Sequence, residues 1–236
     1  MNALDLGCET SVTDAYGNKY DVQVEETERL KRLQRKLGRQ EKGSNNRYRT
    51  RLLIQKEHMK LKNKRDAAAI ELTTEILTVN DTVAMQDEQV SLWRRKRKVK
   101  KKDGTVVKRK GSGKKVQHGI LGRLKKRLGA SKRVHVMSKW VPTTKLCTKC
   151  GHVYKDISLS ERQFVCPHCG QSDGDRDVHS AMNMLWLYQN MRDIIGLDGS
   201  EFKREDFDEG LAACFSAAER KRSTSVDQDA RETILG

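Results

Sequence analysis

Four cysteines late in the chain have the type and spacing of a metal site. They form two Cys-x-x-Cys pairs, and a glycine that permits a tight turn directly follows each pair. Two such pairs are typical of a structural zinc ribbon, whose four thiolates leave no open coordination position. Two disulfides are the alternative, and these are uncommon inside cells. The sequence predicts one structural Zn²⁺ bound by Cys147, Cys150, Cys166 and Cys169.

Carboxylates occur at three places where a metal-dependent nuclease needs them. Asp5 lies in an apolar strand-like segment, Asp87 and Glu88 follow a second one, and Asp175 and Asp177 precede a helical pattern. Burying a lone carboxylate in an apolar strand costs free energy, so the presence of Asp5 there indicates a functional role. Two Mg²⁺ or Mn²⁺ ions can assist phosphodiester hydrolysis, and they take oxygen ligands from different elements. Spacing alone does not establish that these acids converge.

The elements that must position these residues follow from hydrophobic periodicity. Short strands are expected at 3–7, 20–24, 81–85 and 134–137. Helices are expected at 25–40, 46–79, 119–128 and 177–192. Trp93, Trp140 and Trp186 are expected to pack in the core or at its edge, because none lies in an aromatic-rich segment.

The net charge of +16 is concentrated in one region. Residues 94–133 contain nineteen Lys or Arg and one acid. This predicts a nucleic-acid partner rather than a membrane, because no stretch approaches 18 apolar residues. The centre of the region is predicted to be a basic loop, whereas Lys149, Lys155 and Arg162 of the ribbon are expected to face water. The cations predicted to contact the nucleic-acid backbone are Arg94, Arg95, Lys96, Arg97, Lys100, Lys101, Lys102, Lys108, Arg109, Lys110, Lys114, Lys115, Arg123, Lys125, Lys126 and Arg127.

The N-terminus has no basic segment followed by an apolar run, so no signal peptide is visible. Together with the metal-type cysteine pairs, this predicts a cytoplasmic protein of a prokaryote or phage, associated with the nucleoid.

Five motifs follow one another between residues 3 and 192: LDLG, the helix pair LKRLQRKLGR…SNNR, QDE, VPTTKLCTKCG and DRDVHSAMNML. In this order they resemble the TnpB family, transposon-encoded RNA-guided nucleases related to type V CRISPR effectors. The resemblance implies an α/β fold of the RNase H-like, RuvC type. Its mixed sheet would have long flanking helices and an inserted four-cysteine zinc ribbon. The nuclease domain is expected at 1–142 and 173–195, the ribbon at 143–172, and a C-terminal tail, flexible in our expectation, at 196–236.

The resemblance also implies three acids as ligands of two catalytic Mg²⁺ or Mn²⁺ ions: Asp5, a strand-end acid and Asp177. The family's usual strand-end glutamate aligns with Gln86. Glu88 lies two residues further on and would share a strand face with residue 86, so it is the expected ligand, with Asp87 as the alternative. Asp175, Gln86 and His179 are supporting candidates, and the lone histidine is more simply a structural residue.

The resemblance implies a metal-dependent DNA endonuclease of the RNA-guided, transposon-associated type, with DNA and a guide RNA as partners. Only Met1 and Asn2 precede the first predicted strand, so the family's usual N-terminal guide-handling region is expected to be missing. A separate N-terminal half or a second copy is therefore a candidate partner. Two alternatives stay open: a catalytically weak or inactive nucleic-acid-binding protein, and a truncated remnant of a transposon protein.

Overall fold

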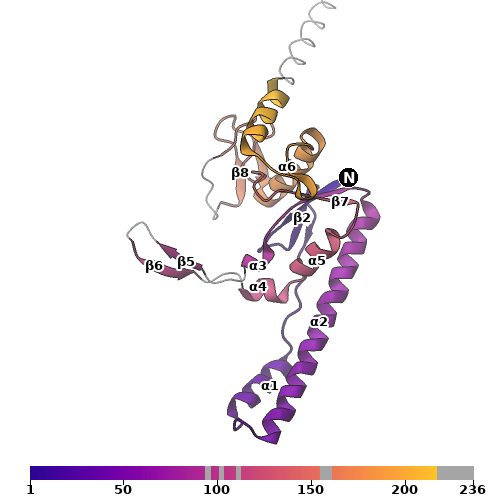
Figure 1. Cartoon of the computed structure of the whole chain (residues 1–236), viewed down its shortest axis with the longest axis vertical. Coiled ribbons are helices and arrows are strands. Elements are labelled where there is room, and N and C mark those ends of the chain that lie inside the picture. The colour runs from indigo at the N-terminus through magenta and orange to yellow at the C-terminus, as the bar shows by residue number, and fades with distance from the viewer. Residues whose placement is uncertain (94–96, 101–103, 110–112, 155–160, 217–236) are drawn as a thin grey trace, which may run out of the picture.

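A five-stranded mixed sheet forms the centre of the molecule (Figure 1). The computed structural model describes residues 1–93, 97–100, 104–109, 113–154 and 161–216. The strand order is β3-β2-β1-β4-β7, in which β1, β4 and β7 are parallel while β2 and β3 are antiparallel to their neighbours. The strands are β1 (Asn2–Leu6), β2 (Val12–Asp14), β3 (Lys19–Tyr20), β4 (Val83–Gln86) and β7 (Val134–Met137). The predicted α/β class with a mixed sheet is confirmed.

Helices cover both faces of this sheet. Successive residues of a strand point to opposite faces, and here apolar residues on both faces are buried by helices. On one face, Leu4 and Met85 pack with α2 (Asn45–Val79) and α5 (Leu121–Leu128). On the other face, Ala3 and Ala84 join the cluster that contains α6 (Arg176–Asn190). Alanines at these positions let α6 approach the sheet closely. The first turns of α6 therefore lie near the end of β1.

Two helices form an arm that extends beyond the sheet (Figure 1). They are α1 (Glu28–Arg39) and α2, and each begins with a hydroxyl cap, Thr27 for α1 and Ser44 for α2. The short helix α3 (Val90–Trp93) precedes the basic region, and α4 (Gly113–His118) lies within it. None of the helices in the described part of the chain is both long and apolar enough to cross a membrane.

The basic region differs from the predicted loop. β5 (Arg97–Lys100) and β6 (Val106–Arg109) form an antiparallel hairpin that extends away from the sheet (Figure 1). The valines favour strands, and Gly104, two residues before β6, has a positive φ of 82° that glycine adopts without strain. The prediction of a loop relied on the number of charged residues and overlooked the few strand-favouring valines among them.

The cysteine segment forms a small unit of its own beside α6. It contains β8 (Gln163–Val165) and β9 (Ser172–Asp175), and a 3₁₀ helix η1 (Leu197–Gly199) follows α6. Residues 204–216 are helical, with Phe207 and Leu211 buried in the core, so this part of the predicted flexible tail is packed. Residues 217–236 lie outside the described part.

The three tryptophans have different surroundings. Trp93 and Trp186 are partly buried against the two core clusters, as expected. Trp140 is 68% exposed, so the expectation of packing is wrong for this residue.

Candidate functional site

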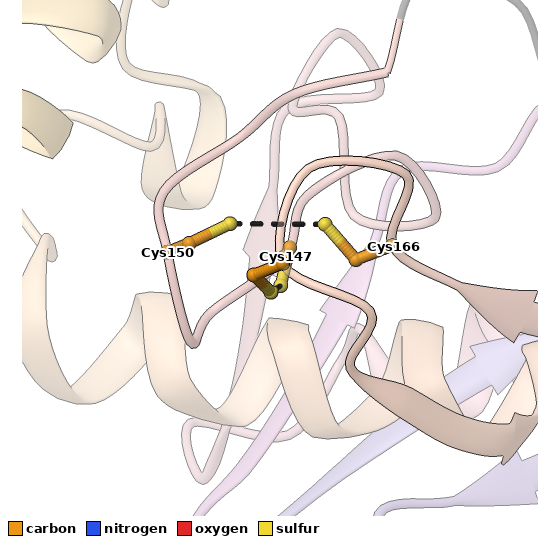
Figure 2. Close-up of side chains that lie close together, drawn as sticks. Cys147, Cys150 and Cys166 are labelled. Carbon is orange, nitrogen blue, oxygen red and sulfur yellow. Dashed lines mark hydrogen bonds between the residues drawn. The ribbon is translucent and has the colours of Figure 1, made fainter.

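The four predicted cysteine ligands lie together. Figure 2 shows the side chains of Cys147, Cys150 and Cys166 converging from two turns. Cys147 Sγ lies 3.7 Å from Cys169 Sγ, and Cys150 Sγ lies 3.7 Å from Cys166 Sγ. Four sulfurs at about 2.3 Å from a central ion would be about 3.8 Å apart, whereas a disulfide needs about 2.05 Å. The cluster thus fits a tetrahedral metal ion and not disulfides.

The backbone around each cysteine pair is arranged in the same way. Gly151 N–H donates to Cys147 O, and Gly170 N–H donates to Cys166 O, each at 2.9 Å. Both glycines have a positive φ of about 70°, as the turn requires. Burial raises the pKa of Cys147 to about 12, and a hydrogen bond from the backbone of Gln171 lowers the pKa of Cys169 to about 7. Metal binding would therefore have to displace protons.

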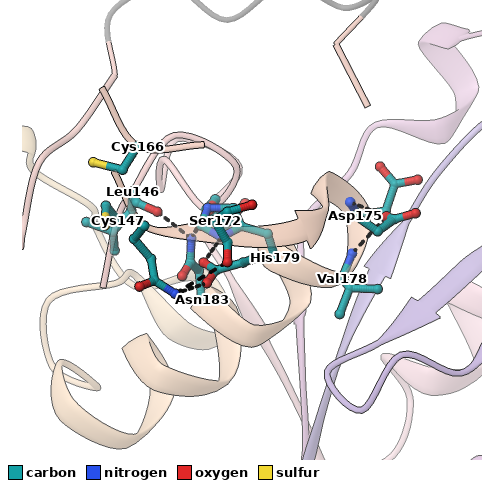
Figure 3. A network of polar contacts seen from close by, with 12 residues as sticks. Leu146, Cys147, Cys166, Ser172, Asp175, Val178, His179 and Asn183 are labelled. Carbon is teal, nitrogen blue, oxygen red and sulfur yellow. Dashed lines mark hydrogen bonds and ion pairs between the residues drawn. The ribbon is translucent and has the colours of Figure 1, made fainter. Parts of the chain in front are cut away.

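The cysteine unit is attached to α6 through His179. The side chain of His179 lies close to that of Asn183 (Figure 3). Its buried ring stacks on Phe164 of β8, with centroids 3.4 Å apart, and its Nδ1 lies 2.7 Å from Asp173 Oδ2. Asn183, one turn along α6, donates from Nδ2 to the carbonyls of Thr143 and Leu146, both at 2.7 Å. Burial lowers the pKa of His179 despite the facing carboxylate, which favours a neutral ring. His179 is not among the residues that line the acidic cleft described next.

Three predicted acids, Asp5, Glu88 and Asp177, line one cleft of about 600 Å³, called here the acidic cleft. Asp5 lies on β1, Glu88 follows β4, and Asp177 is in the first turn of α6. β1 and β4 are parallel, so their carboxyl ends meet at the same sheet edge. Close packing of α6 on β1 brings the third acid to this edge.

The electrostatics of the acidic cleft are unfavourable for negative charge. Burial, followed by repulsion from Asp177, raises the pKa of Asp5 to about 7, although a hydrogen bond from Ser180 opposes the shift. Burial also raises the pKa of Glu88, despite the attraction of Lys125. Carboxylates held together at such a cost are typical of a functional site.

The neighbouring acids lie elsewhere. Asp87 forms an ion pair with Lys125 and is absent from the lining of the acidic cleft. Asp175 caps α6, accepting from the amides of Asp177 and Val178 and from Lys19 Nζ at 2.6 Å. Burial opposes its ionisation, but these hydrogen bonds lower its pKa. Both side chains are thus engaged in positioning contacts.

Gln86 has a different role from the acid that it replaces in the resemblance. It is buried, and its Nε2 donates to the carbonyls of Ser138 at 3.1 Å and Val141 at 2.7 Å. Its Oε1 accepts from Thr143 Oγ1 at 3.1 Å. Ser180 Oγ lies 3.2 Å from that same Thr143 oxygen and 3.1 Å from Asp5 Oδ1. Gln86 therefore anchors a polar chain that ends at Asp5.

Three cations of the acidic cleft were missed by sequence reasoning. They are Lys145, Arg162 and Arg176, which line the cleft together with the three acids. Arg162, which was expected to face only water, immediately precedes β8. Arg176 Nη1 also donates to Glu161 O at 2.7 Å. Lys145 and Arg162 lie within the predicted ribbon at 143–172, and Arg176 begins the helix that follows it. Their positions in or just after the ribbon could have marked them as candidate phosphate-binding residues. Phosphate binding was instead predicted for the larger basic region at 94–133.

Several predicted phosphate contacts are occupied by partners within the chain. Lys115 pairs with Glu9, Arg123 with Asp66, and Lys125 with Asp87. Lys126 and Arg127 are exposed on α5. The backbones of Arg97, Lys100, Lys108, Arg109 and Lys114 lie in described elements. Arg94, Arg95, Lys96, Lys101, Lys102 and Lys110 lie outside the described residues.

The acids are spaced more widely than the cysteines. In the described part of the chain, only the four cysteines place three or more His, Cys, Asp or Glu ligand atoms all within 4.8 Å of one another.

Comparisons with known proteins point to one group. A family model described as "Cas12f1-like, TNB domain" matches residues 125–184, from α5 through the cysteine unit into α6. The "Putative RNA-guided DNA endonuclease" of Streptomyces pristinaespiralis is 27% identical over 190 residues, covering 77% of this chain and 44% of the relative. A chain of the solved "Cryo-EM structure of the Cas12f1-sgRNA-target DNA complex" aligns with a TM-score of 0.40 and 17% identity, covering 78% of this chain and 49% of that one. This chain spans less than half the length of the curated relative.

The electrostatics of Asp5 predict that Asp5→Asn stabilises the metal-free protein. Folding holds Asp5 where its pKa is about 7, so the cost of ionising it grows from about pH 4 to about pH 7 and is full above that. In EDTA at pH 8 we expect the free energy of unfolding to rise by about 1–3 kcal/mol. The gain should shrink as the pH falls towards 4. Thermal unfolding measured across this pH range checks both statements.

The matched control is Asp193→Asn, which changes an exposed acid outside the acidic cleft. It should leave the melting temperature almost unchanged at both pH values. An Asp5→Asn protein no more stable than the parent at pH 8 would contradict the proposed repulsion.

Proposed function

We propose, from the premise that this chain is a TnpB/Cas12f-like protein, that it is a metal-dependent DNA endonuclease. The observation that carries the proposal is the acidic cleft, which is lined by Asp5, Glu88 and Asp177 from separate elements, and also by Glu9 and three cations. The sheet, in which antiparallel strands continue into parallel ones, supports an RNase H-like, RuvC-type fold. Most of that sheet precedes the segment matched by the family model.

Asp5, Glu88 and Asp177 would hold two divalent ions, Mg²⁺ or Mn²⁺. When bound, such ions activate water and stabilise the leaving oxygen of a phosphodiester. The chain's own contribution is to hold the carboxylates in place. Ser180 hydrogen-bonds Asp5, and Asp175 fixes the first turn of α6, from which Asp177 projects.

The cations of the acidic cleft would bind the phosphate of the strand being cut. Lys145, Arg162 and Arg176 line the cleft with the acids, so a phosphate bound between the two sets would meet positive charge on one side. Arginine is well suited to this role because its planar group binds two phosphate oxygens at once. Since two of these cations lie within the predicted ribbon, the cysteine unit would help to form the substrate site.

The cysteine unit would bind one structural Zn²⁺. Four sulfur ligands complete the coordination shell and leave no position for catalysis. The ion would stabilise the two turns and, through Phe164 and His179, the start of α6. Zinc binding would thus support the geometry of the acidic cleft without taking part in the chemistry.

DNA and a guide RNA are the proposed partners. The curated relative is named as an RNA-guided DNA endonuclease, and the solved complex contains sgRNA and target DNA. The net charge of +16 and the exposed cations of α5 suit a polyanionic partner. In such enzymes, base pairing with the guide selects the sequence while the protein reads backbone shape.

The first prediction is metal-dependent cleavage that requires Asp5. The purified chain, with and without co-purifying RNA, should cut labelled single- or double-stranded DNA with Mg²⁺ or Mn²⁺ and not with EDTA. Asp5→Ala should reduce the rate at least about 100-fold, since losing an outer-shell partner already costs about 10- to 100-fold. Glu71→Ala, an exposed acid on α2, is the control and should cut normally. Cleavage that persists in Asp5→Ala would exclude the acidic cleft as the active site.

A second prediction separates the two strand-end acids. Glu88→Gln should reduce cleavage about as strongly as Asp5→Ala, because Glu88 lines the acidic cleft. Asp87→Asn should change the rate less than about fivefold, the effect of an exposed ion pair worth about 0.2–1 kcal/mol. Single-turnover rates measured over a range of Mg²⁺ concentrations test both variants. The opposite ranking would assign the metal to Asp87.

A third prediction concerns zinc. Cys166→Ser should lose the ion and lower the melting temperature, because a buried thiolate ligand is removed. Cys214→Ser, the control, changes a partly buried cysteine outside the cluster and should keep one zinc per chain. Elemental analysis of both purified proteins measures this. Equal zinc contents would refute the four-cysteine site.

A further inference from the structure

Trp140 is a large aromatic side chain that the fold leaves in solvent. It is 68% exposed, and Lys139 Nζ lies 4.8 Å from the centroid of its ring. Exposing this much apolar surface forgoes the burial energy that an indole normally gains.

The turn that carries Trp140 is held rigidly. The Val141 amide donates to Ser138 O at 3.2 Å, and the Trp140 amide donates to Ser138 Oγ at 3.3 Å. Gln86, buried in the sheet, donates to the carbonyls of both Ser138 and Val141. Ser138 N–H in turn donates to Ile195 O at 3.1 Å. A side chain on so constrained a backbone is already ordered for binding, which reduces the entropic cost of contact.

A small cavity adjoins the indole at the same sheet edge as the acidic cleft. It measures about 180 Å³ and is lined by Trp140, Lys139, Asp87, Gly196, Gly199 and neighbouring residues. Asp87 immediately precedes Glu88, which lines the acidic cleft. On its other side the turn continues through Thr143 to Lys145, also of the acidic cleft. One short loop thus joins the two cavities.

The cavity suits one flat ring rather than a peptide or a whole cofactor. Its volume is below the roughly 300–1,000 Å³ of sites for drug-sized ligands. A nucleobase offers a π-face to the indole and amino groups to a carboxylate such as Asp87, whereas a phosphate would be repelled there. The nearby lysine and the net charge of +16 favour a ligand attached to a polyanion.

We propose that Trp140 stacks on one unpaired nucleobase of the strand whose backbone passes through the acidic cleft. This inference rests on the proposed nuclease function and goes beyond it, because it names a base-binding position beside the phosphate-binding one. A base held there fixes the register of the strand relative to Asp5, Glu88 and Asp177. Duplex DNA, whose bases are already stacked and paired, cannot use this position.

The test measures binding and not cleavage, so it remains informative if the chain proves inactive. The full chain and Trp140→Ala are titrated, with Ca²⁺ in place of Mg²⁺, against fluorescein-labelled single-stranded DNA, RNA of the same sequence, and duplex DNA. Trp140→Ala should weaken single-strand binding about 5- to 100-fold, the value of one stacked base. Trp140→Phe should restore most of the affinity. Tyr16→Ala, an equally exposed aromatic at 68%, is the matched control and should bind normally.

Two further readouts separate stacking from other causes. The dependence of log Kd on log salt concentration should be unchanged in Trp140→Ala, because no phosphate contact is removed. In a scan of oligonucleotides with one abasic position, the parent protein should lose affinity at one place, and Trp140→Ala should lose no more there. The DNA and RNA arms show which strand supplies the base.

Three results would overturn the inference. They are a parent protein that does not bind single strands, a Trp140→Ala protein that binds them like the parent, and an equal loss for duplex and single strand. Cleavage that persists in Asp5→Ala, or a parent protein that binds single strands without cutting them, would contradict only the nuclease proposal. The two proposals can therefore fail separately.

Discussion

The burial of carboxylates, close to further negative charge, at one edge of the sheet is the constraint on which the rest of the structure depends. Asp5 and Glu88 are held where burial and neighbouring negative charge raise their pKa values. A fold selected for stability alone would separate these groups or replace them by neutral ones. Here the cost is offset locally, by Ser180 on Asp5 and by Lys125 near Glu88, and globally by the packing of α6 on the sheet.

The cysteine unit packs against α6 and helps to hold this helix, with Asp177 in its first turn, in place. Phe164 and Asp173 contact His179, and Asn183 bonds two carbonyls that precede the first cysteine pair. The helix at 204–216 also supports α6. Phe215 stacks on Trp186 with centroids 5.7 Å apart, and it lies so close to Gly151 that a Cβ there would be 2.8 Å from the ring. Both sets of contacts act on the helix whose first turn carries Asp177, so metal binding at the cysteines and the shape of the acidic cleft are linked through packing.

Local signals in the sequence were sufficient for the elements and for the cysteine ligands. Cysteine spacing, apolar periodicity and turn glycines act over a few residues, and they predicted the long helices and the strands β1, β4 and β7. The strand expected at 20–24 shares only Tyr20 with β3. β2 was missed because its three residues, Val12–Asp14, are too few to show alternation. The surroundings of Trp140 and the cleft position of Arg162 were missed for another reason. Both properties depend on which segments, distant in the sequence, pack against each other in the fold. The residues adjacent to Trp140 or Arg162 in the sequence do not determine this packing.

Gln86 shows why a substitution read from a motif can mislead. Considered alone, an amide in place of a carboxylate suggests a decayed metal site. In the fold the amide has three partners, two carbonyls that accept from it and a hydroxyl that donates to it, and a carboxylate could bond only with the last of these. An acid at this position would leave the carbonyls of Ser138 and Val141 without their side-chain donor and would loosen the turn that presents Trp140. The amide therefore belongs to a consistent arrangement in which Glu88 lines the acidic cleft and Gln86 orders the loop beside it.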